Sequence, residues 1–224
     1  MATLIMQQFR GATCWNMYLM EQTTSLHRWV TTHFREHEII CSEYLGADYL
    51  SGESVSAWRY RAPLRKSVLL RTGWHKIRLF YSMLRMGGIR HEDVMNLSFD
   101  TDSLDLIVSN DVFEHVPCPG KAFAECVRVL RPGGVMLATI PFHSQCDASV
   151  MRAELGDNGV KHLLPSTFHG NPLSEEGSLV YTDFGWDVLG NLQMSGFSSV
   201  AVEVYSSLEY GHWGGGQLVF RMVK

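Results

Sequence analysis

Long apolar runs are missing from this chain. The first six residues are too few for the apolar core of a signal peptide, and charged residues interrupt the later runs. The 5 cysteines are scattered and include no Cys-x-x-Cys pair, which argues against a structural zinc site and suits a reducing compartment. We therefore expect a cytoplasmic protein, and the sequence predicts no metal ligands.

An excess of basic charge is also missing, because the 224-residue chain has a formal net charge of -4. This charge argues against nucleic acid as a partner. At 46% hydrophobic residues the chain can bury a sizeable core without disulfides, and its length fits one domain over residues 1–224. Composition does not indicate the oligomeric state.

Acidic residues are absent from one stretch, between Glu53 and His91. Apolar residues repeat there at helical spacing, so we interpret the stretch as a basic amphipathic insertion at about 54–88. One interpretation of this insertion is a solvated helix that covers the sheet. The others are a lid over an anionic substrate, a contact with a membrane surface and a contact with nucleic acid. The stretch between Glu53 and His91 holds nine of the 19 basic residues: Arg59, Arg61, Arg65, Lys66, Arg71, Lys76, Arg78, Arg85 and Arg90.

Three ordered motifs lie in the middle of the chain. The first, His91–Phe99, carries two acids before a turn. The second, Leu104–Val116, changes from a β-branched run into polar residues and the start of a helix. The third, Ala122–Pro141, has helical spacing, a break at Arg-Pro-Gly-Gly and then a buried strand. This order predicts a right-handed crossover in a parallel sheet.

Ligands of such sheets bind beyond the carboxyl ends of the strands. Asp93, Ser109–Asp111 and Pro141–His143 are predicted to lie on that rim. A carboxylate there can accept hydrogen bonds from an adenine amino group or from ribose hydroxyls, and free backbone amides near Val94 and Asn110 can bind ring nitrogens. The rim therefore suits a nucleoside.

These motifs resemble the C-terminal half of the class I S-adenosylmethionine-dependent methyltransferases. The resemblance covers about a quarter of the chain closely. It implies an α/β fold: a Rossmann-like class I methyltransferase sheet, mostly parallel with a C-terminal antiparallel hairpin, and helices on both faces. S-adenosylmethionine is the cofactor that it implies. The matching residues are Asp93-Val94 with Leu97-Ser-Phe99, Leu104-Asp105 with Glu114-His115-Val116, and Arg128-Val-Leu-Arg-Pro-Gly-Gly134.

The resemblance also implies roles for single residues. Asp93 would bind the adenine end of the donor, and Val94 would add backbone contacts. Asn110 and Asp111 would lie beside the methionine part. His115 would lie near the centre of methyl transfer.

The first half departs from the family pattern. We interpret Glu38–Glu43 as the first strand and Tyr18–His37 as a helix. The family's Gly-x-Gly-x-Gly loop would follow that strand, yet Tyr44–Gly52 retains only two glycines. No acid follows a recognisable second strand, so we assign the ribose contact to Glu43 and a donor-loop role to Gly46. Either a divergent loop replaces the glycine motif, or the donor site has been lost.

The tail fits the same fold, with a helix expected at Asp187–Met194 and strands at Val200–Tyr205 and Gln217–Val223. A substrate-side segment at about 142–183 is polar and rich in turn residues, so we expect a long functional loop. Its predicted acceptor contacts are Phe142, Asn171, Tyr181 and Asp183, although an Asn before a Pro is also ordinary turn chemistry.

A hydroxyl acceptor needs a base, and histidine suits that role near neutral pH. The candidate catalytic residues are His143, His169 and His115. Each has a structural alternative: His143 can cap a strand end, His169 can fix a turn, and His115 can pack at a helix start.

The leading hypothesis is methyl transfer from S-adenosylmethionine to a small or medium polar acceptor at oxygen or nitrogen. One alternative is a methyltransferase-fold enzyme that catalyses a non-methyl reaction such as cyclisation or rearrangement. The other is a non-catalytic module that binds a partner, lipid or nucleic acid through the basic insertion. The retained acid and amide on the rim favour the first hypothesis, and the missing glycine loop favours the others.

Overall fold

The computed structural model describes residues 1–8, 14–56, 59, 87–171, 173–207 and 212–224. Most of the basic insertion at about 54–88 lies outside these residues, so its interpretation stays a prediction. In the described part of the chain, no helix is long and apolar enough to cross a membrane.

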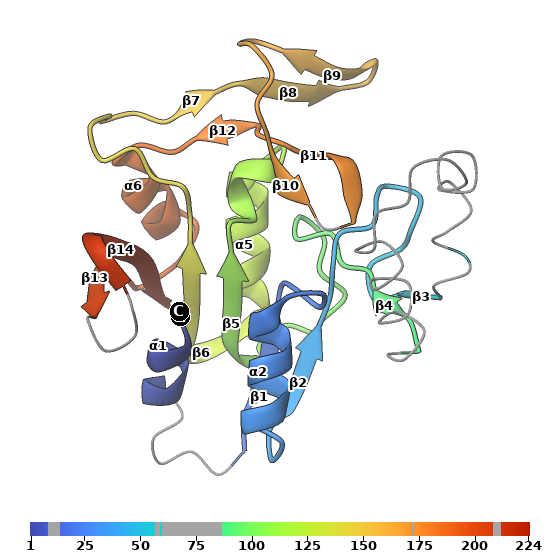
Figure 1. Cartoon of the computed structure of the whole chain (residues 1–224), viewed down its shortest axis with the longest axis vertical. Helices are drawn as coiled ribbons and strands as arrows, with labels where there is room; N and C mark the ends of the chain where they lie inside the picture. The colour runs from blue at the N-terminus through green and yellow to red at the C-terminus, as the bar shows by residue number, and fades with distance from the viewer. Residues whose placement is uncertain (9–13, 57–58, 60–86, 172, 208–211) are drawn as a thin grey trace.

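A six-stranded sheet in the order β13-β14-β6-β5-β1-β2 forms the centre of the protein (Figure 1). β1 (Asn16–Leu19) runs parallel to β2 (Glu38–Cys41) and to β5 (Leu104–Asn110). β5 in turn runs parallel to β6 (Leu130–Thr139). The mostly parallel sheet that the sequence predicted is therefore confirmed.

The C-terminal hairpin is also confirmed. β14 (His212–Val223) is antiparallel to both β6 and β13 (Ser199–Ser207). The preceding helix, α6 (Asp187–Met194), has the predicted bounds, and the chain leaves it through Gly196 at a φ of 111°. Glycine adopts this left-handed backbone without the steric cost that a side chain would bring.

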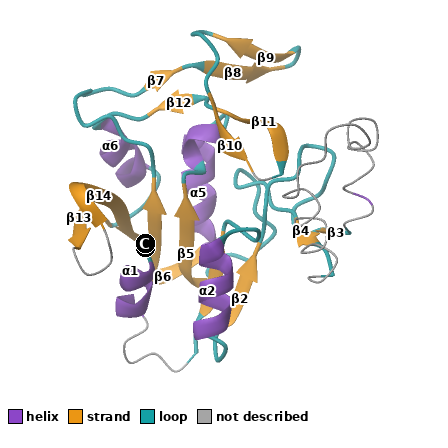
Figure 2. Ribbon diagram, viewed as in Figure 1, coloured by secondary structure: helices purple, strands orange, loops and turns teal. Residues whose placement is uncertain are grey.

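Helices cover both faces of the sheet (Figure 2). α1 (Ala2–Gln8) and α2 (Ser25–His33) pack on one face, and α5 (Pro119–Val129) and α6 pack on the other. Alternation along β5 divides its side chains between the two layers: Leu106 and Val108 belong to the first core and Ile107 to the second. Burial on both faces explains why β5 is apolar almost throughout.

The assignment of the first strand was wrong. Glu38–Cys41 is β2, at the edge of the sheet, whereas the central strand beside β5 is β1, within the segment we had interpreted as a helix. The helix is restricted to α2, where Thr24 caps the amino end by accepting a hydrogen bond from the His27 N–H at 3.2 Å. With only four residues, β1 is too short to show a strand period, but three of them are buried.

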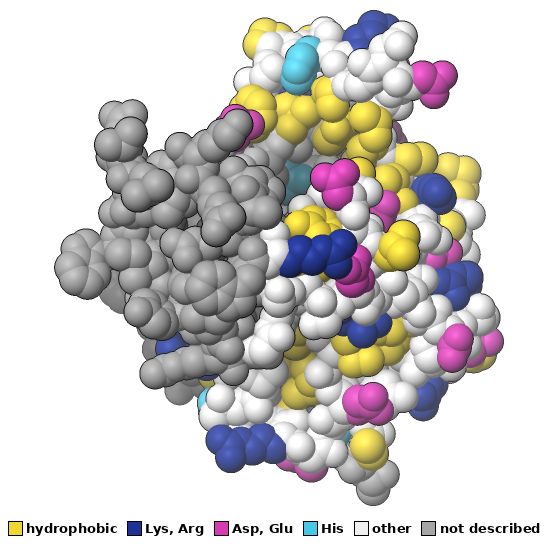
Figure 3. Space-filling model, turned by 90° about the vertical axis from the view of Figure 1, so that its right-hand side faces the viewer, with side chains coloured by type: hydrophobic (Ala, Val, Ile, Leu, Met, Phe, Trp, Pro, Cys, Tyr) yellow, Lys and Arg dark blue, Asp and Glu magenta, His cyan; other side chains and the backbone are white. Residues whose placement is uncertain are grey.

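A small layer of antiparallel strands replaces the loop expected at about 142–183. β7 (Val150–Met151) pairs with β12 (Thr182–Asp183), β8 (Ala153–Gly156) with β9 (Gly159–His162), and β10 (Phe168–Asn171) with β11 (Ser174–Leu179). This cap layer lies beyond the carboxyl ends of β5 and β6 (Figure 1). Hydrophobic side chains gather in the upper part of the face in Figure 3, where the layer lies. Its exposed apolar residues include Val150, Met151, Leu155, Val160, Leu163, Leu164 and Phe168.

Two glycines give opposite predictions for the same substitution. A Cβ at Gly185 would lie 2.6 Å from the Ala148 carbonyl carbon and 2.7 Å from the Cys146 oxygen, so we expect Gly185→Ala to lower the free energy of unfolding by roughly 1–3 kcal/mol. Gly190 is exposed in α6 with open space around it, and Gly190→Ala should raise that free energy by about 0.5–1 kcal/mol. Denaturant melts measure both, and equal effects would contradict the packing at Gly185.

Candidate cofactor and acceptor site

Polar side chains follow four neighbouring segments at the carboxyl edge of the sheet. Asn110 ends β5, Glu21 follows β1 and Glu43 follows β2. Beyond β2, His91 pairs in parallel with Glu43 and leads to Asp93. Because neighbouring strands are about 5 Å apart, these groups form a row of about 15 Å.

Glu43 organises the loop that follows the central strand. Its Oε1 accepts hydrogen bonds from the N–H groups of Gln22 and Thr23 at 2.8 and 2.9 Å, and from the Thr23 hydroxyl at 2.8 Å. In the described part of the chain Oε2 receives no such bond. Burial raises the pKa of the carboxyl against the effect of these bonds, and the charge of Glu21 adds to the rise. One oxygen thus holds the loop, and the other is left for a ligand.

Glu21 joins the loop to β5. The Asn110 amide donates to Glu21 Oε1 at 2.7 Å, so the acid after β1 and the amide at the end of β5 are in direct contact. Burial raises the pKa of Glu21, the bonds from Thr24 and Asn110 oppose the rise, and Asp111 adds to it. The loop Met20–Thr24 contains no glycine, so side-chain hydrogen bonds shape it.

Asp93 occupies the far end of the row. Its neighbour Glu92 is buried, where its carboxylate binds Arg90 Nε at 2.8 Å and the Ser98 N–H at 3.0 Å, so only Asp93 of the two acids faces the rim. Asp93 Oδ1 accepts from the Met95 N–H at 2.9 Å. Among the described residues, nothing accepts a hydrogen bond from the Val94 N–H. This pair retains a carboxylate oxygen and an amide for a ligand.

The loop Tyr44–Gly52 folds against this end of the row, and not after the central strand as expected. The Leu45 N–H donates to His91 Nδ1 at 2.9 Å, and the Asp93 N–H donates to Ser51 Oγ at 3.0 Å. The Tyr44 ring lies 5.3 Å from the His91 ring, and burial together with the charge of Asp93 raises the Tyr44 pKa. Gly46 has a φ of 115° and open space around it. The segment that follows the central strand β1 is Met20–Thr24, and the donor-loop role assigned to Gly46 stays a prediction.

Asp111 links the row to a second group of residues. Its φ is 49°, a left-handed backbone that costs on the order of 1 kcal/mol in a residue with a side chain. Thr139 holds it in place, because its carbonyl accepts from the Asp111 N–H at 3.1 Å and its hydroxyl donates to Asp111 Oδ1 at 2.9 Å. The charge of Asp111 affects the pKa values of Glu21, Glu114 and His115.

Two of the three candidate histidines meet at a buried acid. The short 3-10 helix η2 (Phe113–His115) supplies Glu114 and His115, and β10 supplies His169. Glu114 Oε1 lies 3.4 Å from His115 Nε2 and 3.3 Å from His169 Nδ1, and the two rings meet edge to face at 5.0 Å. We call these three residues the His–Glu cluster.

The hydrogen bonds of the cluster fix one tautomer. His115 Nδ1 lies 2.8 Å from the Leu179 carbonyl, which can only accept, so Nδ1 carries a proton and Nε2 of the neutral ring faces Glu114. Burial lowers the pKa of His115 and raises that of Glu114 to about 7. Glu114 Oε2 is buried and has no hydrogen-bond partner in the described part of the chain.

The third candidate, His143, contacts Asp183 and not the His–Glu cluster. Its Nε2 is 4.0 Å from Asp183 Oδ1, and Asp183 also binds Arg152 Nη1 at 2.6 Å. The His143 side chain is 56% exposed, so solvent reaches it. This pair joins the end of β6 to β12, and it combines one predicted base with one predicted acceptor contact.

Two other predicted acceptor contacts, Phe142 and Asn171, interact with side chains or backbone of the protein itself. Phe142 packs edge to face on Trp186 at 4.8 Å and on Phe220 at 5.8 Å. Asn171 accepts from the Leu173 N–H at 2.7 Å and donates to Ser178 Oγ at 2.9 Å, which is the turn chemistry named as its alternative.

Tyr181 lies beside the His–Glu cluster. Its N–H donates to the Glu114 carbonyl at 2.7 Å, and its side chain is largely buried. The cap layer is therefore attached to η2 at the same residues that carry the cluster.

Glu21 and Glu114 were not assigned a role from the sequence. Glu21 ends an apolar run and precedes Thr-Thr-Ser and a helix, a strand–acid–cap order that could have identified it. Glu114 stands in the Glu-His motif, but its partner His169 lies 55 residues further along the chain. No local pattern reveals that contact.

Comparisons with known proteins agree with the fold. The family model described as a methyltransferase domain matches residues 65–138. A probable S-adenosylmethionine-dependent methyltransferase from Mycolicibacterium smegmatis is 42% identical over 53 residues, which are 24% of this chain and 21% of that protein. An uncharacterized methyltransferase from Mycobacterium avium is 51% identical over 41 residues, 18% of this chain and 16% of that protein.

Among solved structures, the CurJ carbon methyltransferase has a TM-score of 0.52 at 12% identity, over 98% of this chain and 52% of that chain, and shows the same fold. The matched segments span about a fifth of the length of the two relatives. Residues 65–138 therefore match the methyltransferase domain family, and the sheet has the fold of the class I S-adenosylmethionine-dependent methyltransferases.

Proposed function

We propose that this protein transfers a methyl group from S-adenosylmethionine to a small or medium polar acceptor at oxygen or nitrogen. The observation that carries the proposal is the row of polar groups at the carboxyl edge, in the order Asp93, Glu43, Glu21 and Asn110. A row of about 15 Å suits an extended molecule with a nucleoside at one end and an amino acid at the other.

The row suggests how the donor lies. The free oxygen of Asp93 and the Val94 N–H suit the adenine amino group and a ring nitrogen, and Tyr44 offers a ring beside them. Glu43 Oε2 suits a ribose hydroxyl. Glu21 and Asn110 suit the methionine end, which leaves the methyl group toward Asp111 and the His–Glu cluster.

In the reaction, a lone pair of the acceptor attacks the methyl carbon. The carbon–sulfur bond breaks with its electrons moving to sulfur, and S-adenosylhomocysteine leaves. A hydroxyl acceptor must also lose its proton, and the residues that can organise that step are His115 and His169, with His143 as the solvent-exposed candidate.

Calorimetric titration with S-adenosylmethionine and S-adenosylhomocysteine tests the donor site. We expect micromolar binding of both, and about a tenfold loss in Asp93→Asn, because one charged hydrogen bond contributes about 1.5–3 kcal/mol. Asp48→Asn is the matched control, since Asp48 is an exposed residue of the neighbouring loop. Absence of binding by the unmodified protein would remove the proposal.

One alternative function is supported by the loop Met20–Thr24. This loop contains no glycine, although the family has a glycine-rich loop where the donor binds. On that alternative the enzyme catalyses a non-methyl reaction such as cyclisation or rearrangement. Product analysis separates the two reactions, because methyl transfer releases one S-adenosylhomocysteine for each product molecule and a rearrangement releases none.

A further inference from the structure

The His–Glu cluster has the composition of a metal site. It offers one carboxylate oxygen and two imidazole nitrogens, and these ligand atoms lie within 4.8 Å of one another. We propose that Glu114, His115 and His169 bind a divalent transition-metal ion of the zinc class. The role of this ion in activating the acceptor rests on the proposed function, but its binding does not.

The distances fit such an ion. Zinc binds imidazole nitrogen at about 2.0–2.1 Å and carboxylate oxygen at about 2.0–2.2 Å in a tetrahedral site, which places two neighbouring ligand atoms about 3.3–3.5 Å apart. Glu114 Oε1 is 3.4 Å from His115 Nε2 and 3.3 Å from His169 Nδ1. Only His115 Nε2 and His169 Nδ1 need to approach each other. The His169 side chain is 41% exposed, so it has room to rotate.

The surroundings of His115 support the same conclusion. A histidine that binds a metal usually donates its other ring N–H to a carbonyl or carboxylate, which orients the ring and leaves the second nitrogen free to coordinate. His115 Nδ1 donates to the Leu179 carbonyl at 2.8 Å, so Nε2 points its lone pair at Glu114 Oε1. A lone pair facing a carboxylate oxygen needs a proton or a cation between them.

The burial of the Glu114 carboxylate also favours a bound cation. The residue is 1% exposed and its Oε2 has no hydrogen-bond partner, yet no Lys or Arg in the described ranges forms an ion pair with it. A buried carboxylate without a compensating charge is costly, and a divalent ion bound at Oε1 would offset that cost.

Ligand chemistry selects the class of ion. Imidazole suits zinc, cobalt, nickel and iron, whereas magnesium and calcium prefer oxygen ligands alone. Three protein ligands leave a fourth position open, as in catalytic zinc sites. An acceptor hydroxyl bound there would lose its proton more readily, because the ion stabilises the resulting oxyanion.

Cobalt titration tests the site directly. The protein is stripped of metal with a chelator, dialysed, and titrated with Co²⁺ while its visible absorption is recorded. We expect saturation at one Co²⁺ per chain, with loss of the bands when Zn²⁺ is added. We expect Co²⁺ to bind at least about tenfold more weakly to His169→Ala and to Glu114→Gln, because each variant removes one ligand.

His162→Ala is the matched control, since His162 is exposed in β9 and belongs to the same cap layer. It should bind Co²⁺ like the unmodified protein. Absence of saturable binding, or unchanged binding in His169→Ala and Glu114→Gln, would overturn the metal site. Equal loss in His162→Ala would do the same, because it would reveal nonspecific surface binding.

The titration also keeps the two proposals separate. S-adenosylhomocysteine affinity is measured on the same metal-free samples. Co²⁺ binding without donor binding would leave the metal site standing and remove the methyl-transfer proposal. Donor binding and turnover without Co²⁺ binding would support the methyl-transfer proposal and remove the metal site. Unchanged donor affinity in His169→Ala would also show that this variant is folded.

Discussion

S-adenosylhomocysteine should bind about 10- to 100-fold more weakly after Glu43→Ala, and the variant should also unfold at a lower temperature. The carboxylate has two tasks, because Oε1 holds the N–H groups of Gln22 and Thr23 and Oε2 is available to the donor ribose. Loss of a hydrogen bond to a charged group costs about 1.5–3 kcal/mol, which corresponds to this range of affinity. Calorimetry measures the affinity and a thermal melt the stability.

Glu43→Gln separates the two tasks of this side chain. The amide oxygen still accepts from both N–H groups, so most of the thermal stability should remain, while donor affinity should still fall about tenfold because the charge is gone. Glu38→Ala is the control, since Glu38 is exposed at the opposite end of the same strand. A Glu43→Gln protein with unchanged donor affinity would contradict the ribose contact.

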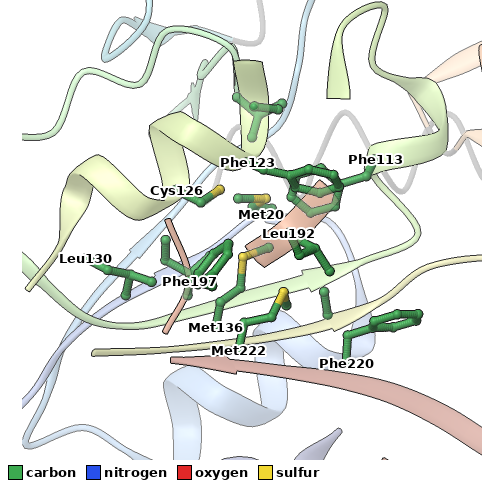
Figure 4. Close-up of a cluster of buried hydrophobic side chains, with 14 of the residues drawn as sticks. Met20, Phe113, Phe123, Cys126, Leu130, Met136, Leu192, Phe197, Phe220 and Met222 are labelled. Carbon is green, nitrogen blue, oxygen red and sulfur yellow. The ribbon is translucent and has the colours of Figure 1, made fainter. Parts of the chain in front are cut away.

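The second large effect is expected at Phe123. This side chain is 1% exposed in the core between the sheet and α5, where it lies beside Phe113 (Figure 4). Its ring is 4.8 Å from that of Phe113 and 6.4 Å from that of Phe184. Phe123→Ala leaves a cavity, so we expect the free energy of unfolding to fall by about 3–5 kcal/mol. For a domain of this size that corresponds to a thermal midpoint lower by roughly 6–20 °C.

Phe168→Ala is the matched control for this prediction. Phe168 is 51% exposed in β10, so its truncation removes little buried area and should change the free energy by about 0.5 kcal/mol or less. Similar losses for the two variants in a denaturant melt would contradict the assignment of Phe123 to the centre of the core.

The C-terminal half could be predicted from sequence because its signals are strong and local. β5 is a buried apolar run, α5 has a clear helical period, and Gly196 marks the end of α6. The first half could not be predicted in the same way. β1 has four residues and no alternation visible to a pattern search, since both faces of the strand are buried.

One error in the first half led to the others. Once Glu38–Glu43 was taken as the first strand, the donor loop was placed at Tyr44–Gly52 and the second strand had no acid. The sheet order shows that Glu38–Cys41 is the second strand, so that Glu43 is the acid that follows it. The strand number was wrong, and the ribose contact assigned to Glu43 stays a prediction.

The candidate site could be predicted only where its residues are neighbours in sequence. Asn110, Asp111 and His115 lie in one motif, but the contact of Glu114 with His169 depends on how the cap layer folds back over η2. Antiparallel pairs of two to six residues, many of them exposed, leave little periodic signal in this segment. The expectation of a long loop there was wrong for that reason.

The attachment of the cap layer to η2 has a consequence for which parts of the layer can change in sequence. Two short contacts, from Tyr181 N–H to the Glu114 carbonyl and from His115 Nδ1 to the Leu179 carbonyl, anchor the layer through main-chain atoms of the cap. Main-chain contacts survive changes of side chain, so the outer hairpin β8–β9 can vary in sequence while the anchor persists. The sequence of that hairpin can thus be exchanged without disturbing the row of polar groups on the sheet.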